Sequence, residues 1–288
     1  MFSGIEIEQI LGLAGIAAII SVIGTWIGII LKDYLFSRAF ESWKQKNSLN
    51  QIYQKFKDPL LLSARELCTR LMEILDEYPT CYLRTSVLNV KLDSFHADRL
   101  MENSSDDPYY QRYKLVSTTY RLSSFLGWLE LYRQEIVFLT SGNYEHSKRL
   151  EKTLDKIRSA LADGQLNTAD NWLEWKDMLI FREEIRAIGE SMLDSQGMSK
   201  TVIGYRKFSE LFYDKDTKQD HIYRWVSIVL SFLLDLEQEK DFRKNRLILL
   251  TIYLIQLLKL LDSNKLEQRF IAARKSYVEL LVNCPLLE

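Results

Sequence analysis

The sequence predicts an all-α protein with one N-terminal transmembrane helix followed by a large multi-helix cytoplasmic bundle. The supporting observations are an uncharged apolar run near the N-terminus, apolar residues at three- and four-residue spacing through most of the remainder, and a scarcity of turn residues. The chain has 11 glycines, almost half of them before position 29, and only 4 prolines, too few for a fold of many short strands. We expect an extracytoplasmic tail, a transmembrane helix, a helical stalk and a cytoplasmic helical domain (residues 1–8, 9–32, 33–57 and 58–288).

The transmembrane segment is predicted from a run without charge, Gln9 to Leu31. At about 1.5 Å per residue this run extends roughly 34 Å, enough for a hydrocarbon core of about 30 Å. A cleaved signal peptide would need a basic start and a shorter apolar core. Here Glu6 and Glu8 make the start acidic. The remaining alternative is a buried core helix, which rarely runs this far without a charge.

The flanks of this segment predict its orientation. Lys32, Arg38 and Lys44 follow it, whereas the residues before it include two acids and no Lys or Arg. Basic residues stay on the cytoplasmic side of a membrane. We therefore expect a single-pass protein of the plasma (inner) membrane, with its N-terminus outside and its large domain in the cytoplasm.

Small residues recur along one side of the predicted span and suggest that it self-associates. Ser21, Gly24, Thr25 and Gly28 lie at three- and four-residue spacing, and the two glycines form a GxxxG motif. Small side chains let helix backbones approach closely in lipid. This pattern predicts a homo-oligomer, with a passive monomeric anchor as the alternative, since GxxxG also occurs by chance.

The cytoplasmic domain is predicted to be a series of helices. Apolar residues repeat every seven positions at Leu115, Leu122, Leu129 and Ile136, and Asp58-Pro59 is a typical helix start. The predicted helices cover Asp58–Tyr78, Tyr109–Leu139, a segment ending near Ala162, Met178–Met192, Ile222–Leu236 and Leu247–Leu261. The last two are apolar but only about 15 residues long, shorter than the ~20 needed to cross a bilayer, so we expect central helices of a bundle. Within residues 80–108 the segment TSVLNVKL fits either a short strand or a helix, and NSSDDP at 103–108 is expected to be a loop.

No catalytic, metal or cofactor motif is present. The histidines (His96, His146 and His221) and cysteines (Cys68, Cys81 and Cys284) are scattered and lack ligand spacing. There is no glycine-rich phosphate loop. The formal net charge of -1 gives no argument for nucleic-acid binding. We therefore expect that the protein is not an enzyme and uses no cofactor, although catalytic residues can converge from distant positions.

Two groups of charged residues are candidate sites. The first is a polar network within otherwise apolar helices, comprising Arg70, Glu130, Arg133, Glu135, Arg182, Glu184 and Arg186. It is either an exposed face with surface ion pairs or a buried network that holds a ligand, since buried charge is costly unless paired. The second group is basic and comprises Lys240, Arg243, Lys244 and Arg246, together with Arg269, Arg274 and Lys275. These are either solvated helix ends or the site of a phosphate-bearing, nucleotide-like ligand.

Three motifs spread over residues 55–275 carry a family resemblance. They are DPLLLSARELCTRL with Asp58, Pro59, Leu67 and Arg70; the aromatic helix with Trp128, Glu130, Arg133, Glu135, Phe138 and Leu139; and FREEIRAIGE with Phe181, Arg182, Glu184, Arg186, Ile188, Gly189 and Glu190, followed by Tyr205. On these residues the chain resembles an uncharacterised family of bacterial and fungal helical proteins, often with an N-terminal membrane helix. The family pattern has Gly at Glu183 and Gln at Ile185. The resemblance implies no established activity.

Together these features predict a membrane-anchored cytoplasmic sensor or effector that oligomerises through its membrane helix. One setting with this layout is a membrane-disrupting or ion-conducting effector of bacterial anti-phage defence, an analogy of architecture. The alternative is a passive tethered adaptor that binds a cytoplasmic protein. An enzyme would require a closed pocket that gathers the Arg and Glu residues named above.

Overall fold

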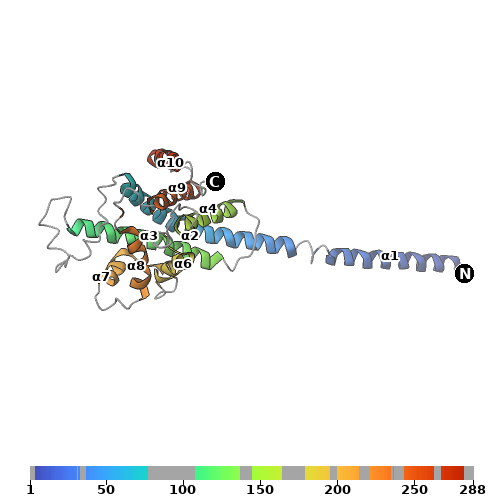
Figure 1. The fold of residues 1–288 in the computed structure, drawn as a ribbon. Coiled ribbons are helices and arrows are strands. Elements are labelled where there is room, and N and C mark those ends of the chain that lie inside the picture. The colour runs from blue at the N-terminus through green and yellow to red at the C-terminus, as the bar shows by residue number, and fades with distance from the viewer. Residues whose placement is uncertain are drawn as a thin grey trace. The chain divides into compact units, whose positions relative to one another are not determined.

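The computed structural model describes residues 4–30, 32, 37–76, 108–136, 145–163, 179–194, 200–213, 221–234, 236, 243–262 and 267–281. These residues are mostly helical, which confirms the all-α prediction (Figure 1). The helices are α1 (Gly4–Ile30), α2 (Ser37–Asp76), α3 (Pro108–Ile136), α4 (Glu145–Ala162), α6 (Arg182–Ser191), α7 (Tyr205–Tyr213), α8 (His221–Leu233), α9 (Arg243–Leu261) and α10 (Gln268–Leu280). Residues 80–107 lie outside the described residues.

Contacts divide the chain into two compact units. The first comprises Met1–Ile52 and Leu139–Gly142, and the second comprises Tyr53–Phe138 and Asn143–Glu288. The first unit contains α1, whose side chains at 12 and 14–30 are all exposed. Among the described residues, no helix combines the length and the apolar character needed to cross a membrane. The membrane span over residues 9–32 therefore stays a prediction.

The predicted helix start at Asp58-Pro59 is wrong. Helix α2 runs without interruption from Ser37 to Asp76, with Pro59 inside it. A proline in a helix interior removes one backbone hydrogen bond and costs about 3 kcal/mol. Packing opposes this cost, because one face of α2 on either side of Pro59 is buried (Phe56, Leu60, Ala64, Leu67 and Leu71).

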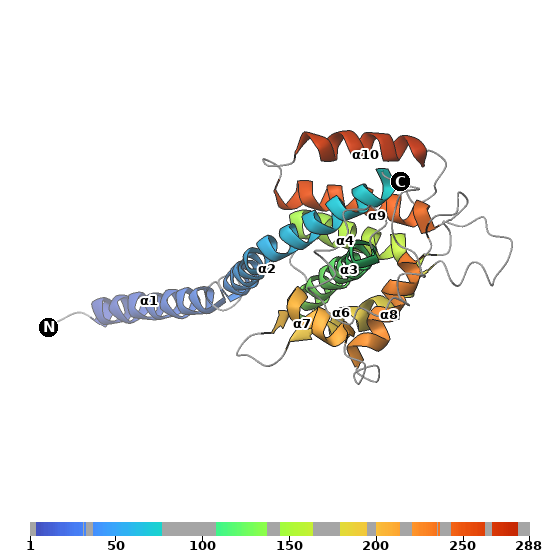
Figure 2. The same ribbon diagram turned by 90° about the vertical axis from the view of Figure 1, so that its left-hand side faces the viewer.

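Helix α9 forms the centre of the second unit. Every residue from 246 to 255 is buried, as expected for the core helix that the sequence predicted at Leu247–Leu261. It packs against α4 and α10, and Figure 2 shows α10 lying alongside it. Helix α3 packs against α6 and α8 in the rest of the unit.

Two glycines allow α3 and α6 to approach closely. A Cβ atom at Gly189 would lie 2.7 Å from the Leu126 carbonyl oxygen and 2.8 Å from Glu130 Cβ, and one at Gly127 would lie 3.0 Å from Met192 Cβ. After α6 the chain forms the antiparallel strands β1 (Leu193–Asp194) and β2 (Thr201–Val202). This short ladder was not predicted, because two-residue strands carry no alternating apolar pattern.

Candidate functional site

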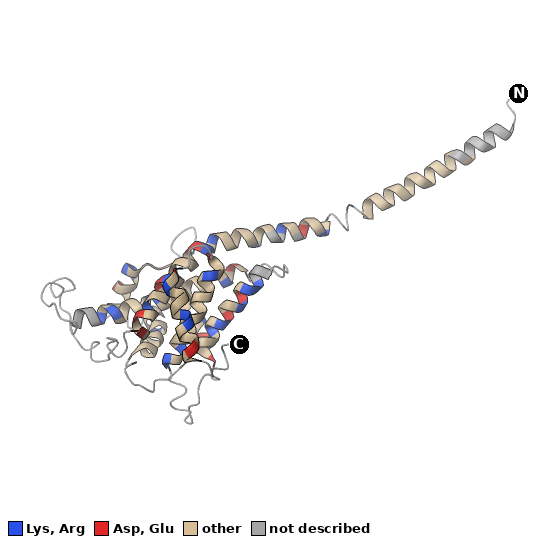
Figure 3. Ribbon diagram, turned by 90° about the horizontal axis from the view of Figure 1, so that it is seen from above, with Lys and Arg blue, Asp and Glu red and all other residues tan. Residues whose placement is uncertain are grey.

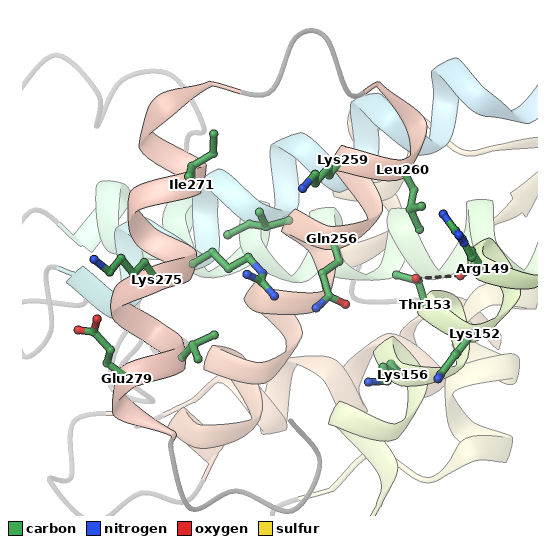
Figure 4. A pocket seen from close by; sticks show the side chains of 13 residues that line it. Arg149, Lys152, Thr153, Lys156, Gln256, Lys259, Leu260, Ile271, Lys275 and Glu279 are labelled. Atoms are coloured by element: carbon green, nitrogen blue, oxygen red, sulfur yellow. Dashed lines mark hydrogen bonds between the residues drawn. The ribbon is translucent and has the colours of Figure 1, made fainter. Parts of the chain in front are cut away.

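A groove of about 880 Å³ lies between α4, α9 and α10, within the second unit (Figure 4). Its volume lies within the range of small-molecule sites. The lining residues are Arg149, Lys152, Thr153, Lys156, Ile255, Gln256, Lys259, Leu260, Ile271, Arg274, Lys275, Val278 and Glu279. The groove is the candidate functional site because it brings side chains of α4 together with side chains of α9 and α10, which lie far from α4 in sequence.

The α4 side of the groove follows from the amphipathic pattern of this helix. Its apolar residues are buried at three- and four-residue spacing (Leu150, Leu154, Ile157 and Leu161), and α4 packs against α9. Arg149, Lys152 and Lys156 recur at the same spacing beside this apolar stripe. They therefore share one side of the helix and face the groove.

Helix α9 supplies a mixed apolar and polar surface at the middle of the groove. Ile255 is buried, Gln256 and Leu260 are half-buried and Lys259 is exposed. These residues occupy neighbouring positions one turn apart, so they lie on a single side of α9. Figure 4 shows Gln256 between the labelled residues of α4 and those of α10.

The third side of the groove is formed by α10. Phe270 and Tyr277 are its buried residues. The Tyr277 hydroxyl donates a hydrogen bond of 2.7 Å to Asp76 Oδ1 at the end of α2, and burial, followed by this contact, raises the pKa of Tyr277. With these two aromatics turned inward, Arg274 and Lys275 line the groove.

The groove is strongly cationic. In the described part of the chain its lining includes six Lys or Arg residues and a single acid, Glu279. Burial, with a further contribution from the positive charge of Lys152, lowers the pKa of Lys156, whose ammonium lies 5.6 Å from the centre of the Tyr253 ring. Among the described residues, Lys152, Lys259, Arg274 and Lys275 form no salt bridge.

The basic residues singled out from the sequence separate into two sets. Arg274 and Lys275 line the groove, whereas Arg243, Lys244, Arg246 and Arg269 are not among its lining residues. Lys240 lies outside the described residues. The predicted site at facing helix ends is thus replaced by one along helix sides, with new members from α4 and α9.

Arg243 and Arg246 act at helix C-termini. Arg243 Nη1 donates to the carbonyl oxygens of Ser231, Phe232 and Leu234, at 3.3, 3.1 and 2.7 Å, at the end of α8. Arg246 is fully buried and donates to the Ala160 carbonyl oxygen, at 3.2 Å, near the end of α4. Cations stabilise these helix ends because the last carbonyl groups lack partners within the helix. Arg269 is exposed and pairs with Glu267 at 2.7 Å.

The predicted polar network is divided among several separate contacts. Glu130 is buried and accepts hydrogen bonds from Arg133 and Gln134, and the bond to Glu130 raises the pKa of Arg133. Glu135 pairs instead with Lys55 at 2.9 Å, with both side chains largely exposed. Glu130 therefore belongs to a local group on α3.

The other members of this network also find local partners. Arg70 is buried and pairs with Glu73 at 2.8 Å. Arg182, 44% exposed, pairs with Asp155 and Asp163, each at 3.1 Å, and so joins α6 to α4. Glu184 accepts a hydrogen bond of 2.9 Å from the Phe181 backbone N–H and caps α6, and Arg186 is exposed. Glu130, Glu135, Arg182 and Arg186 therefore do not form one mutually paired interior network.

Sequence reasoning missed four of the groove cations: Arg149, Lys152, Lys156 and Lys259. A signal was present on α4, where three of them recur on one side of an amphipathic helix. That pattern is also typical of a solvated helix face, and only the packing of α10 beside α9 distinguishes the two cases.

Metal and thiol chemistry gain no support from the described residues. They contain no group of three His, Cys, Asp or Glu side chains that could hold a metal ion. Cys68 is buried, and burial raises the pKa of its thiol to about 12, so it stays protonated at neutral pH. Cys81, Cys284 and His96 lie outside the described residues.

The chain matches no family model, no curated protein and no solved structure. The family resemblance carried by the three sequence motifs is therefore still a prediction, and the function proposed below rests on the chain itself.

Proposed function

We propose that the chain is a membrane-anchored sensor or effector, in which α1 lies in a lipid bilayer and the second unit responds to a cytoplasmic signal. The observation that carries this proposal is the surface of α1. From Ile16 to Ile30 its large apolar side chains, including Trp26, are 52–66% exposed. Contiguous exposed apolar surface of this kind marks a site of membrane or protein interaction.

Lipid is the better match for this surface than a protein groove. A groove covers one face of a helix, whereas residues 14–30 of α1 are exposed on every side of the helix and none of them carries a charge (Figure 3). The uncharged sequence from Gln9 to Leu31 also extends beyond the described side chains. At about 1.5 Å per residue, the 27 residues of α1 extend roughly 40 Å. Each isoleucine or valine favours insertion by about 0.3–0.6 kcal/mol.

The proposal includes self-association of α1 through Ser21, Gly24, Thr25 and Gly28. A Cβ atom at Gly24 or Gly28 would meet nothing within 4 Å, so this side has room for a second helix. The Thr25 hydroxyl donates a hydrogen bond of 2.8 Å to the Ser21 carbonyl oxygen in its own helix. Association would therefore depend on close backbone approach at the glycines rather than on a hydrogen bond from Thr25.

The test compares three proteins expressed at equal levels: the full chain, a version lacking residues 1–32, and Gly24→Leu/Gly28→Leu. After an alkaline wash the full chain should remain with membranes and the truncated one should be released. The double variant should remain in the membrane but lose the chemical crosslinks between copies that the full chain shows. Growth and membrane potential in the same cells report whether association disturbs the bilayer.

Two results would count against the proposal. Release of the full chain by the alkaline wash would remove the anchor. Equal crosslinking of the full chain and the double variant would show that the glycines do not mediate self-association. If, in addition, neither protein changed growth or membrane potential, the chain would be a passive tethered adaptor and not an effector.

A further inference from the structure

We infer that the groove between α4, α9 and α10 binds a phosphate-bearing small molecule that combines at least two negative charges with an apolar portion. This site lies entirely within the second unit. The inference therefore does not depend on whether α1 lies in a membrane.

The first argument is the concentration of charge. Cations from three helices surround one cavity, with Glu279 as the single acid among the described lining residues (Figure 4). Like charges held close together repel one another, and a concave site with low-dielectric walls strengthens their combined field. A ligand with several negative charges relieves this repulsion more effectively than a monovalent ion.

The second argument is the hydrogen-bonding character of the lining. Lysine and arginine side chains are donors only, and arginine matches the oxygens of phosphate in a two-point contact. The Gln256 amide adds further donor capacity, and Thr153 already donates its hydroxyl proton to the Arg149 carbonyl oxygen at 2.9 Å. Such a lining requires a ligand rich in acceptors, and phosphate supplies three acceptor oxygens per group.

The third argument concerns the remainder of the ligand. Ile255, Leu260, Ile271 and Val278 also line the groove, and inorganic phosphate would leave this apolar surface wet. A nucleotide or the headgroup region of an anionic lipid fits both halves of the lining, because each joins phosphate to an apolar portion. A long nucleic acid fits less well, because the groove holds about 880 Å³ and the whole chain has a net charge of -1.

The pKa of Lys156 would respond to an anion bound in the groove. Its pKa is lowered by burial and by Lys152. An anion bound beside it would favour the protonated ammonium and raise this pKa.

The experiment uses the full chain in phosphatidylcholine nanodiscs. Binding of ATP, ADP and AMP is measured by equilibrium dialysis. Binding of cardiolipin, whose two phosphates carry two negative charges, is measured by replacing part of the phosphatidylcholine and detecting bound lipid by native mass spectrometry. The site variant is Lys152→Glu/Arg274→Glu. The matched control, Lys200→Glu/Arg206→Glu, makes the same charge change at exposed residues that do not line the groove.

The wild-type chain should bind at least one of these two ligand sources saturably. If it is the nucleotide, affinity should fall in the order ATP, ADP, AMP and should weaken with added salt. The site variant should lose at least 100-fold in affinity, since each charge-assisted contact contributes at least about tenfold. The control should change by less than about threefold, and Lys152→Arg/Arg274→Lys should retain binding within about tenfold.

Each outcome has a definite meaning. Nucleotide binding lost in the site variant assigns the groove to a free ligand, and cardiolipin binding lost in the same way assigns it to a lipid headgroup. Absence of saturable binding to both probes overturns the inference. Equal binding by the site variant and the wild type also overturns it. The inference is likewise overturned if a polyglutamate peptide displaces the bound probe as strongly as the unlabelled ligand does, because the groove would then fit an acidic protein partner.

Discussion

Replacing Gly189 with alanine tests the packing of α6 on α3 directly. The new Cβ atom would lie 2.7 Å from the Leu126 carbonyl oxygen, about 0.7 Å short of the 3.4 Å at which ordinary van der Waals contact begins. Because that oxygen belongs to the backbone of α3, no side-chain rotation relieves the overlap. Helix α6 must therefore move away from α3.

Two opposing effects determine the expected change in stability. Moving α6 by about 0.7 Å loosens the contacts of Ile185 and Ile188, which are buried in this helix, and a gap of 0.5–1 Å forfeits a quarter to a half of a contact's attraction. Overpacking of this kind costs about 3 kcal/mol at the upper end of the usual range. Alanine recovers about 1 kcal/mol of helix propensity, so the net loss should be about 2 kcal/mol.

The loss of unfolding free energy is measured by urea titration of the full chain in a non-ionic detergent, with circular dichroism as the signal. The matched control is Gly204→Ala, where an added Cβ atom meets nothing within 4 Å and where the stability should change by less than about 0.5 kcal/mol. If Gly189→Ala left the midpoint unchanged or raised it, α6 and α3 would not approach as closely as the structure shows.

Two further predictions concern side chains whose surroundings were ambiguous in the sequence. Arg186→Ala should lower the free energy of unfolding by no more than about 1 kcal/mol, because Arg186 is exposed, and a loss of 3–5 kcal/mol in urea unfolding would restore the buried network. In a Cys81→Ser/Cys284→Ser background, Cys68 should react with a maleimide at pH 8 only as fast as the protein unfolds, because it is buried with a raised pKa of about 12. Rapid labelling without denaturant, compared with the guanidinium-unfolded control, would show that the thiol is accessible.

The helices could be predicted because their apolar residues repeat at helical spacing. The leucines from Leu115 to Leu129 and the apolar run at the centre of α9 are buried where the periodicity places them. The continuity of α2 through Pro59 could not be predicted from local rules. Proline normally ends or begins a helix, and only the tertiary burial of Phe56, Leu60 and Leu67 on both sides of it makes one continuous helix favourable.

The candidate site could be predicted only in part. Arg274 and Lys275 were identified because charge clusters are visible in sequence, yet Arg246 belonged to the same group and proved to be a buried contact at the end of α4. Local sequence does not distinguish a cation that faces solvent from one that satisfies a carbonyl group of a distant helix. The contribution of α4 depended on the packing of α4, α9 and α10, which no short motif encodes.

The way α10 is attached determines how a ligand bound in the groove would affect other helices of the unit. Among the described residues, two buried aromatics and the Tyr277–Asp76 hydrogen bond attach α10, so we expect it to open at a lower free-energy cost than the core of the unit. A molecule that contacts both α4 and α10 would bind only the docked form of α10 and would shift the population toward it. Because the hydrogen-bond acceptor is Asp76, the last residue of α2, this docking equilibrium is linked to a helix that begins at Ser37, shortly after α1.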